Sequence, residues 1–279
     1  MPIDSAEAAR LILRGQAPPA AWVPDIVELH LERSYLTDLR PLASLTALRR
    51  LYLTRSRITD AAPLASLTRL QRLHLSFTAV SDVAPLAGMT ELEGCFLTGS
   101  LVEDVAPLAG LSRLERLDLG DTRVSDVAPL ASLSNLRSLD LSATRVSDIA
   151  PLAMLSGLHY LDLANAPITD LSPLAKLAEL RWLILRGTRA DVSVLAQLSG
   201  CQIITTATMP RTDGCGASVG PCHCRFTSAM RDRYRLTHRI GRQETERLGF
   251  QYQRRQLAAE HRAGVDRNAI VPHHRLLHR

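Results

Sequence analysis

The sequence predicts an α/β solenoid in which a parallel sheet forms one wall and short helical or 3₁₀ segments form the opposite wall. Three observations lead to this prediction. A 22-residue period runs from residue 26 to residue 200, and such a period is typical of stacked repeats. Each copy contains a short alternation of apolar and polar residues, as in a half-buried strand. Most copies then carry a proline before two leucines spaced three apart, which suits a short helical turn.

The copy LRSLDLSATRVSDIAPLAMLSG, residues 136–157, shows how one coil is built. Leu139 and Leu141 are expected to point into the core, and Asp140 between them to point outward. Each coil therefore adds one strand to the sheet. The leucines that follow Pro151 are expected to cover the core from the opposite wall, since proline is tolerated in the first turn of a helix.

Two polar columns recur at fixed positions of the coil, and both are predicted to be structural. Hydroxyl groups in the first column can bond backbone groups of a buried bend. Carboxylates in the second can cap the helical segment that follows. A calcium ladder is the alternative for the second column, but one acid per coil is too few for the six to eight oxygens of that ion. The columns are Ser34, Ser56, Thr78, Ser100, Thr122, Thr144, Ala166 and Thr188, and Asp38, Asp60, Asp82, Asp104, Asp126, Asp148, Asp170 and Asp191.

The ends of the array are expected to be sealed, because a solenoid exposes core at its termini. Residues 1–25 are predicted to form a cap, with an amphipathic helix over 4–14 that begins at Asp4 and Glu7 and ends at Gly15. The repeat array is predicted to span 26–204 in about eight coils, with a ninth strand beginning in CQIITT.

Residues 205–279 are predicted to be a basic, disordered tail, and an out-of-frame reading of a gene is the alternative origin of this segment. Residues 1–200 have a net charge of −3, whereas residues 201–279 have 14 arginines, 6 acids and a net charge of +8. Nucleic-acid binding through this tail is an alternative function. The group Cys215, Cys222, His223 and Cys224 does not match a standard zinc-site spacing, so no metal is expected.

Phrases such as LDLSATRVSDIAPLAML and LDLANAPITDLSPLAKL, in register over about 26–200, resemble the leucine-rich repeat family. The resemblance is to the 22-residue class of bacterial internalin-like proteins, and the repeats are similar also to those of the phosphatase-1 regulatory subunit. It implies a curved solenoid whose strands line the concave side. It also implies a role in binding other proteins, without selecting a partner.

The outward positions of the strands are the predicted binding site, because the core does not dictate their residues. Exposed aromatic and arginine side chains most often anchor protein interfaces. An acidic row is expected to attract a basic segment and to persist in water, where each repulsion costs only about 1 kcal/mol. The candidates are Arg50, Tyr52, Arg72, His74, Phe96, Arg116, Asp118, Asp140, Tyr160, Asp162 and Trp182.

The sequence gives no support for catalysis, because it lacks a phosphate-binding glycine loop, a nucleophile elbow and a metal dyad. No cofactor and no small-molecule substrate are expected. An odd cysteine count and the absence of an export signal or a long apolar run favour a cytoplasmic protein that does not enter membranes. We therefore expect a cytoplasmic, bacterial-type adaptor that binds a protein or peptide, with the regulatory subunit of an enzyme as the alternative.

Overall fold

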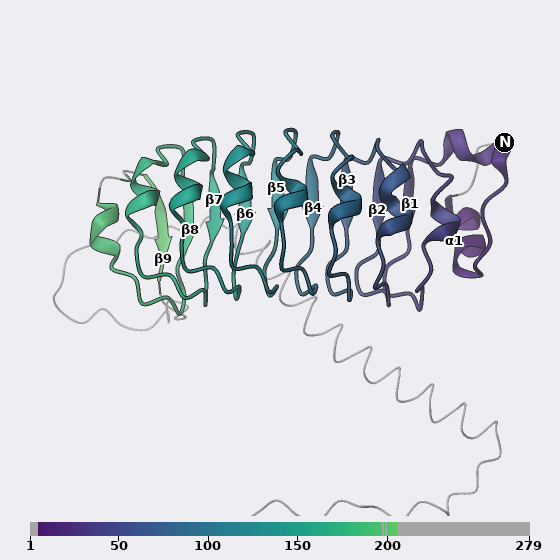
Figure 1. Ribbon diagram of the computed structural model, residues 1–279. Coiled ribbons are helices and arrows are strands. Elements are labelled where there is room, and N and C mark those ends of the chain that lie inside the picture. Colours follow the sequence, from purple (N-terminus) through teal and green to yellow (C-terminus); the bar gives the residue numbers. More distant parts are fainter. Residues whose placement is uncertain (1–4, 197, 199, 206–279) are drawn as a thin grey trace, which may run out of the picture. The chain divides into compact units, whose positions relative to one another are not determined.

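A computed structural model describes residues 5–196, 198 and 200–205 of the 279-residue chain (Figure 1). The predictions made for residues 206–279, including the cysteine and histidine group and the arginine-rich segments, lie outside these residues. Asp4 of the predicted helix start lies outside them as well.

The described residues form one parallel sheet whose strands follow each other in chain order. Adjacent strands are offset by one coil, so that Leu139 pairs with Leu117 on one side and Leu161 on the other. The sheet of the predicted solenoid is therefore confirmed, including the strand in CQIITT. The strands are β1 (Glu28–His30), β2 (Arg50–Tyr52), β3 (Arg72–His74), β4 (Gly94–Phe96), β5 (Arg116–Asp118), β6 (Ser138–Asp140), β7 (Tyr160–Asp162), β8 (Trp182–Ile184) and β9 (Gln202–Ile204).

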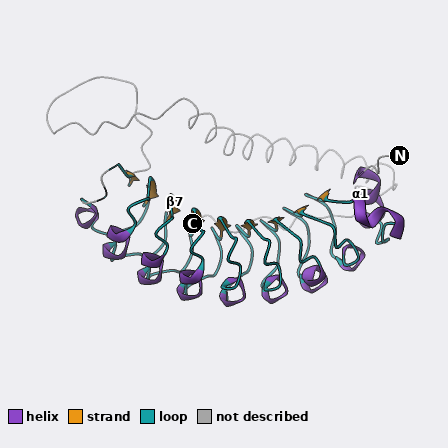
Figure 2. Cartoon of the chain, turned by 90° about the horizontal axis from the view of Figure 1, so that it is seen from above, coloured by secondary structure: helices purple, strands orange, loops and turns teal. Residues whose placement is uncertain are grey.

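The opposite wall consists of short 3₁₀ helices, one after each of the strands β1–β8. Figure 2 shows the repeat array as an arc with the strands on its inner side and the helical segments on its outer side. The predicted curvature and the placement of strands on the concave side are thus confirmed. The 3₁₀ helices are η1 (Ala20–Asp25), η2 (Arg40–Leu42), η3 (Ala62–Ser66), η4 (Ala84–Leu86), η5 (Ala106–Leu108), η6 (Ala128–Ser132), η7 (Ala150–Met154), η8 (Ser172–Lys176) and η9 (Val192–Leu195).

The core is a continuous column of leucines between the two walls. Leu139 of β6, Leu141 just after that strand, and Leu152 and Leu155 of the facing segment are fully buried, as the alternation predicts. Cys95 occupies a leucine position and is also fully buried. Burial raises the pKa of its thiol to about 12, so this cysteine is an apolar part of the core.

Both polar columns form the predicted bonds, except at Ala166, which has no hydroxyl, and at Ser100, whose hydroxyl has no partner among the described residues. The Thr144 hydroxyl donates to the backbone oxygen of Leu141 at 2.6 Å, and Asp148 accepts the backbone N–H of Ala150 at 2.8 Å. Each aspartate of the second column accepts the same kind of hydrogen bond from the backbone N–H two residues later. The carboxylates therefore hold the first turn of each 3₁₀ helix from η2 to η9 in place.

A helix closes the front end of the array. Helix α1 (Ser5–Leu13) packs against β1 and buries Ala8 and Ile12. Gly15 takes a positive φ of 76° just after the helix, in the way a glycine ends a helix. The 3₁₀ helix η1 lies within the predicted cap of residues 1–25, but no separate helix was predicted there. None of the described helices is long and apolar enough to cross a membrane.

Candidate protein-interaction face

We define the concave face as the outward side chains at the first and third residues of strands β1–β8. The strand register places these residues in two straight columns, with a spacing of about 4.8 Å between neighbouring strands. Every residue proposed from the sequence lies at one of these positions. The structure therefore brings the predicted residues together on one surface, while their part in binding stays a prediction.

Four aromatic rings form a continuous stack along the third position of strands β1–β4. Ring centroids are 4.4 Å apart between His30 and Tyr52, 4.6 Å between Tyr52 and His74, and 4.1 Å between His74 and Phe96. We call His30, Tyr52, His74 and Phe96 the ring stack. His30 is not among the candidates proposed from the sequence, and the signal that could have found it is the run of four ring-bearing residues in consecutive coils.

Gly94 makes room for the last ring of the stack. A Cβ atom added to Gly94 would lie 3.1 Å from Cε2 of Phe96, which is tighter than an ordinary contact. The ring of Phe96 thus lies over the backbone of its own strand, and Gly94 is buried beneath it. A glycine at this outward position is explained by the space that the ring needs.

Arginines flank the ring stack at the first position of the strands. Arg50 forms an ion pair with Glu28, with 2.8 Å between the nearest nitrogen and oxygen. Arg72 and Arg116 are exposed, and neither forms an ion pair within the part of the chain that the structure describes. Burial lowers the pKa of His74, so the stack contributes a neutral imidazole here at neutral pH. On the strands of the ring stack, Arg72 is thus an exposed cation, and Arg116 lies on β5, one strand beyond the stack.

The acidic row of Asp118, Asp140 and Asp162 continues the column beyond the ring stack. Thr98 donates a hydrogen bond to Asp118, and Ala164 donates its backbone N–H to Asp162 at 2.8 Å. Burial, aided by the charge of Asp140, raises the pKa of Asp118 and of Asp162 to about 6. These side chains are partly buried, so their ionised forms lose hydration.

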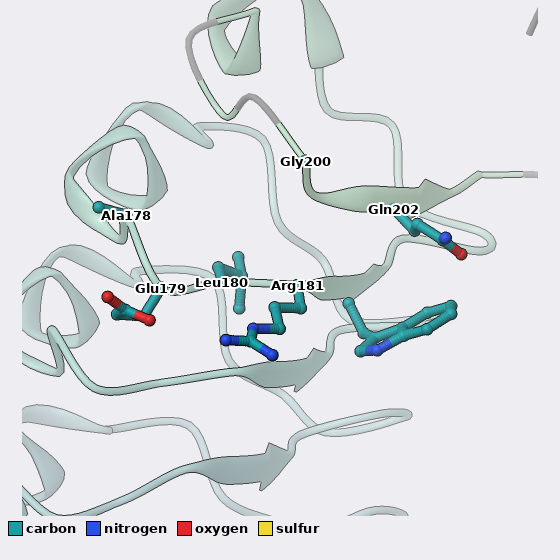
Figure 3. Close-up of a pocket in the computed structure, with 7 residues that line it drawn as sticks. Ala178, Glu179, Leu180, Arg181, Gly200 and Gln202 are labelled. Atoms are coloured by element: carbon teal, nitrogen blue, oxygen red, sulfur yellow. The ribbon is translucent and has the colours of Figure 1, made fainter. Parts of the chain in front are cut away.

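Tyr160 and Trp182 lie beside this row on the last coils. The Tyr160 hydroxyl approaches Asp162 at 3.4 Å, and burial raises its pKa. Trp182 lines a pocket of about 390 Å³ together with Arg181 and Gln202, where β8 meets β9 (Figure 3). This pocket was not predicted from the sequence, because its lining comes from two neighbouring coils.

The chain is similar in sequence and structure to known repeat proteins. The family described as Leucine Rich repeats (2 copies) matches residues 112–154 and 134–176. Comparison with curated proteins gives no significant sequence match. Internalin C2 from Listeria monocytogenes is 34% identical with a TM-score of 0.66, over 72% of this chain and 91% of that one.

Two further structures support the same fold. Internalin F from Listeria monocytogenes is 25% identical with a TM-score of 0.53, over 72% of this chain and 74% of that one. The plant peptide hormone receptor RGFR1, solved in complex with RGF2, has a TM-score of 0.58 over 66% of this chain and 32% of the receptor. At 15% identity it shows the fold alone. From the repeat match and the internalin C2 similarity, the chain belongs to the internalin-like leucine-rich repeat proteins.

Proposed function

We propose that the protein is an adaptor or recognition subunit that binds a partner protein or peptide on its concave face. The observation that carries the proposal is the ring stack, four aromatic side chains held in one row on a surface that the core does not require. Tyrosine, tryptophan and arginine dominate the binding energy of protein interfaces, and all three occur on this face. Leucine-rich repeat domains are in general protein-interaction modules.

The charges of the concave face suggest how acidic and basic residues are distributed along the partner segment. Arg50 and Arg72 lie on strands that carry the ring stack, whereas Arg116 lies on β5, the strand on which the acidic row begins at Asp118. A partner segment with an acidic part over the arginines and a basic part over the acidic row would complement both halves. Such complementarity fixes register and accelerates encounter more than it adds affinity.

The carboxylates of the acidic row would gain most from such a partner. A basic side chain would restore to Asp118 and Asp162 the charge stabilisation that burial removes. Partner binding should therefore release few protons above pH 6 and more below it, where the row is partly protonated. Affinity that falls as the pH drops below about 6 is the expected signature.

The test is capture of partners from a lysate of the native organism, followed by mass spectrometry. Wild-type protein is compared with a variant in which Tyr52, Phe96 and Trp182 are alanine. A matched control changes Met154, an apolar side chain of the outer wall that is 68% exposed. Loss of the same captured protein in the triple variant, with retention in Met154→Ala, supports the proposal, and equal capture by both variants contradicts it.

The same experiment addresses the finer parts of the proposal. An enzyme among the captured proteins would favour a regulatory subunit over a simple adaptor. Capture with and without residues 205–279 tests the nucleic-acid alternative, which requires those residues. We also propose a cytoplasmic location, which cell fractionation with an antibody to the repeat array would check.

A further inference from the structure

The loop that leaves each strand passes through a residue with positive φ in every coil. The values range from 54° at Arg33, Asp121 and Ala143 to 72° at Gly187. Glycine adopts this conformation freely, and asparagine and aspartate tolerate it. Coils four, five, seven and eight follow that preference with Gly99, Asp121, Asn165 and Gly187. The first three coils carry Arg33, Arg55 and Phe77 instead, and the sixth carries Ala143.

Phe77 is the clearest departure from the preference. It has a φ of 57°, and bulky residues are outliers in this region, where strain costs of order 1 kcal/mol. Its side chain is 48% exposed, so burial in the core does not compensate for the strain. The ring lies over Gly99, where an added Cβ would come within 2.6 Å of Cδ1 of Phe77. The next coil thus leaves space for an exposed aromatic ring.

Two arginines of the second coil each lie over an exposed ring, one over Phe77 and the other over Tyr35. The guanidinium of Arg55 lies 5.2 Å from the centroid of Phe77, and that of Arg57 lies 4.7 Å from the centroid of Tyr35. Tyr35 is 69% exposed. We call Tyr35, Arg55, Arg57 and Phe77 the edge patch. It spans three coils on the side of the array where the strands end, outside the concave face.

The guanidinium groups of the edge patch are oriented but not neutralised. Neither Arg55 nor Arg57 forms an ion pair or a side-chain hydrogen bond within the described residues. A guanidinium stacked on a ring keeps its N–H groups free at the edge, where they can grip a carboxylate in bidentate fashion. Stacking also restricts the side chain before binding, which lowers the entropy lost on association.

We propose that the edge patch is a second interaction surface, which binds an acidic, apolar-containing segment of a partner protein. The two arginines take carboxylates of that segment, and the exposed rings take its apolar side chains. The chain's own tail is excluded by charge, since residues 201–279 have 14 arginines and 6 acids. A nucleic acid is disfavoured because affinity for it rests on many phosphate contacts, and the patch offers two oriented cations beside apolar rings.

A labelled peptide provides the test on the full chain. The probe is a short fluorescein-labelled peptide in which glutamates alternate with leucine and phenylalanine, and binding is followed by fluorescence anisotropy. Arg55→Gln combined with Arg57→Gln should weaken binding roughly tenfold or more, as expected when charge-assisted hydrogen bonds are lost. The matched control is Arg123→Gln with Arg145→Gln, which removes the same charge from exposed residues at a corresponding coil position.

A second variant separates binding from folding. Phe77→Gly relieves the backbone strain, so the melting temperature should not fall, while peptide binding should weaken severalfold. If the Arg55 and Arg57 variant and the Arg123 and Arg145 variant lost the same amount of peptide affinity, net charge alone would explain the effect. That result would overturn the proposal. Unchanged binding in Phe77→Gly would overturn it as well. The proposal would also be overturned if a single-stranded oligonucleotide bound more tightly than the peptide and this binding were lost in the Arg55 and Arg57 variant. The concave-face variant should bind the peptide normally, which distinguishes this surface from the proposed adaptor site.

Discussion

The rings of His74 and Phe96 lie almost parallel, with centroids 4.1 Å apart and an angle of 7° between their planes. They belong to neighbouring strands and are 22 residues apart in sequence. The register of the sheet sets their spacing, and Gly94 gives the Phe96 ring the space to lie flat. The stack is therefore a product of the repeat itself, in which equivalent positions of successive coils meet face to face.

Removing Phe96 should change the titration of His74. Burial is the largest cause that lowers the pKa of His74 below its ordinary value of 6.5, so Phe96→Ala, which uncovers one face of the imidazole, should raise that pKa. The measurement is an NMR titration of the histidine ring signals. Phe77→Ala serves as control, since Phe77 contacts Arg55 and lies outside the stack. An unchanged His74 titration in Phe96→Ala would contradict the role given to the stack.

The acidic row should make stability fall as the pH rises from about 4 to about 6. Burial raises the pKa of Asp118 and of Asp162 to about 6, whereas these carboxyls titrate near 3.8 in the unfolded chain. The unfolded state loses its protons first, so folding is penalised progressively until the native carboxyls ionise near pH 6. Asp118→Asn should remove this penalty and raise the free energy of unfolding at neutral pH by about 1 kcal/mol, after allowance for solvent screening.

Urea unfolding at about pH 4 and about pH 7 measures this effect, because the variant should gain stability only at the higher value. The asparagine oxygen can still accept the hydrogen bond of Thr98, so packing is preserved. Asp126→Asn, at an exposed capping acid, is the control and should change little at either pH. A gain of equal size at both pH values would show that charge burial is not its cause.

The repeat, the core and the capping columns were predictable because local geometry dictates them in every coil. Leu139 and Leu141 bracket Asp140 in a strand alternation that can bury only one side. The capping bond from Asp148 to Ala150 depends on residues two apart, so sequence spacing alone identifies it. Eight copies within one chain also act as an internal comparison, which separates the positions that the fold fixes from those that vary.

The properties of the concave face were not predictable to the same degree, because they depend on contacts between coils. Whether Asp118 is solvated depends on Thr98 and on the neighbouring Asp140, which belong to other coils. The edge patch was not predicted, because Tyr35 and Arg57 occupy loop positions, where residue type varies without periodicity. The 3₁₀ helix η1 lies outside the repeat, so no internal comparison could indicate it.

The capping aspartates should each stabilise the array through an acceptor oxygen more than through charge. Asp148→Ala removes the acceptor for the Ala150 N–H and should cost about 1 kcal/mol, as for other caps of helix termini. Asp148→Asn keeps an acceptor oxygen and should cost much less. Thermal and urea unfolding of the two variants gives the comparison. Equal destabilisation by alanine and asparagine would mean that the negative charge, and not the hydrogen bond, is what matters.

Two serines of the hydroxyl column provide a last test with an internal control. Ser56 is buried and donates to the backbone oxygen of Leu53 at 2.5 Å, whereas the buried hydroxyl of Ser100 has no hydrogen-bond partner among the described residues. Ser56→Ala removes one of the two hydrogen bonds that the Leu53 oxygen accepts from Ser56, leaving the backbone N–H bond, and should cost about 1 kcal/mol. Ser100→Ala removes an unpaired buried polar atom, so it should be neutral or stabilising.

The two substitutions are chemically identical and occupy the same position of coils two and four, so the difference between their free energies of unfolding isolates the hydrogen bond. Urea unfolding with fitted slopes gives that difference directly, provided that both variants keep the wild-type slope. A destabilisation by Ser100→Ala as large as that by Ser56→Ala would show that the Ser100 hydroxyl is bonded in solution. Ser100 would then act like the other hydroxyls of the column, through a bond to the backbone oxygen three positions earlier.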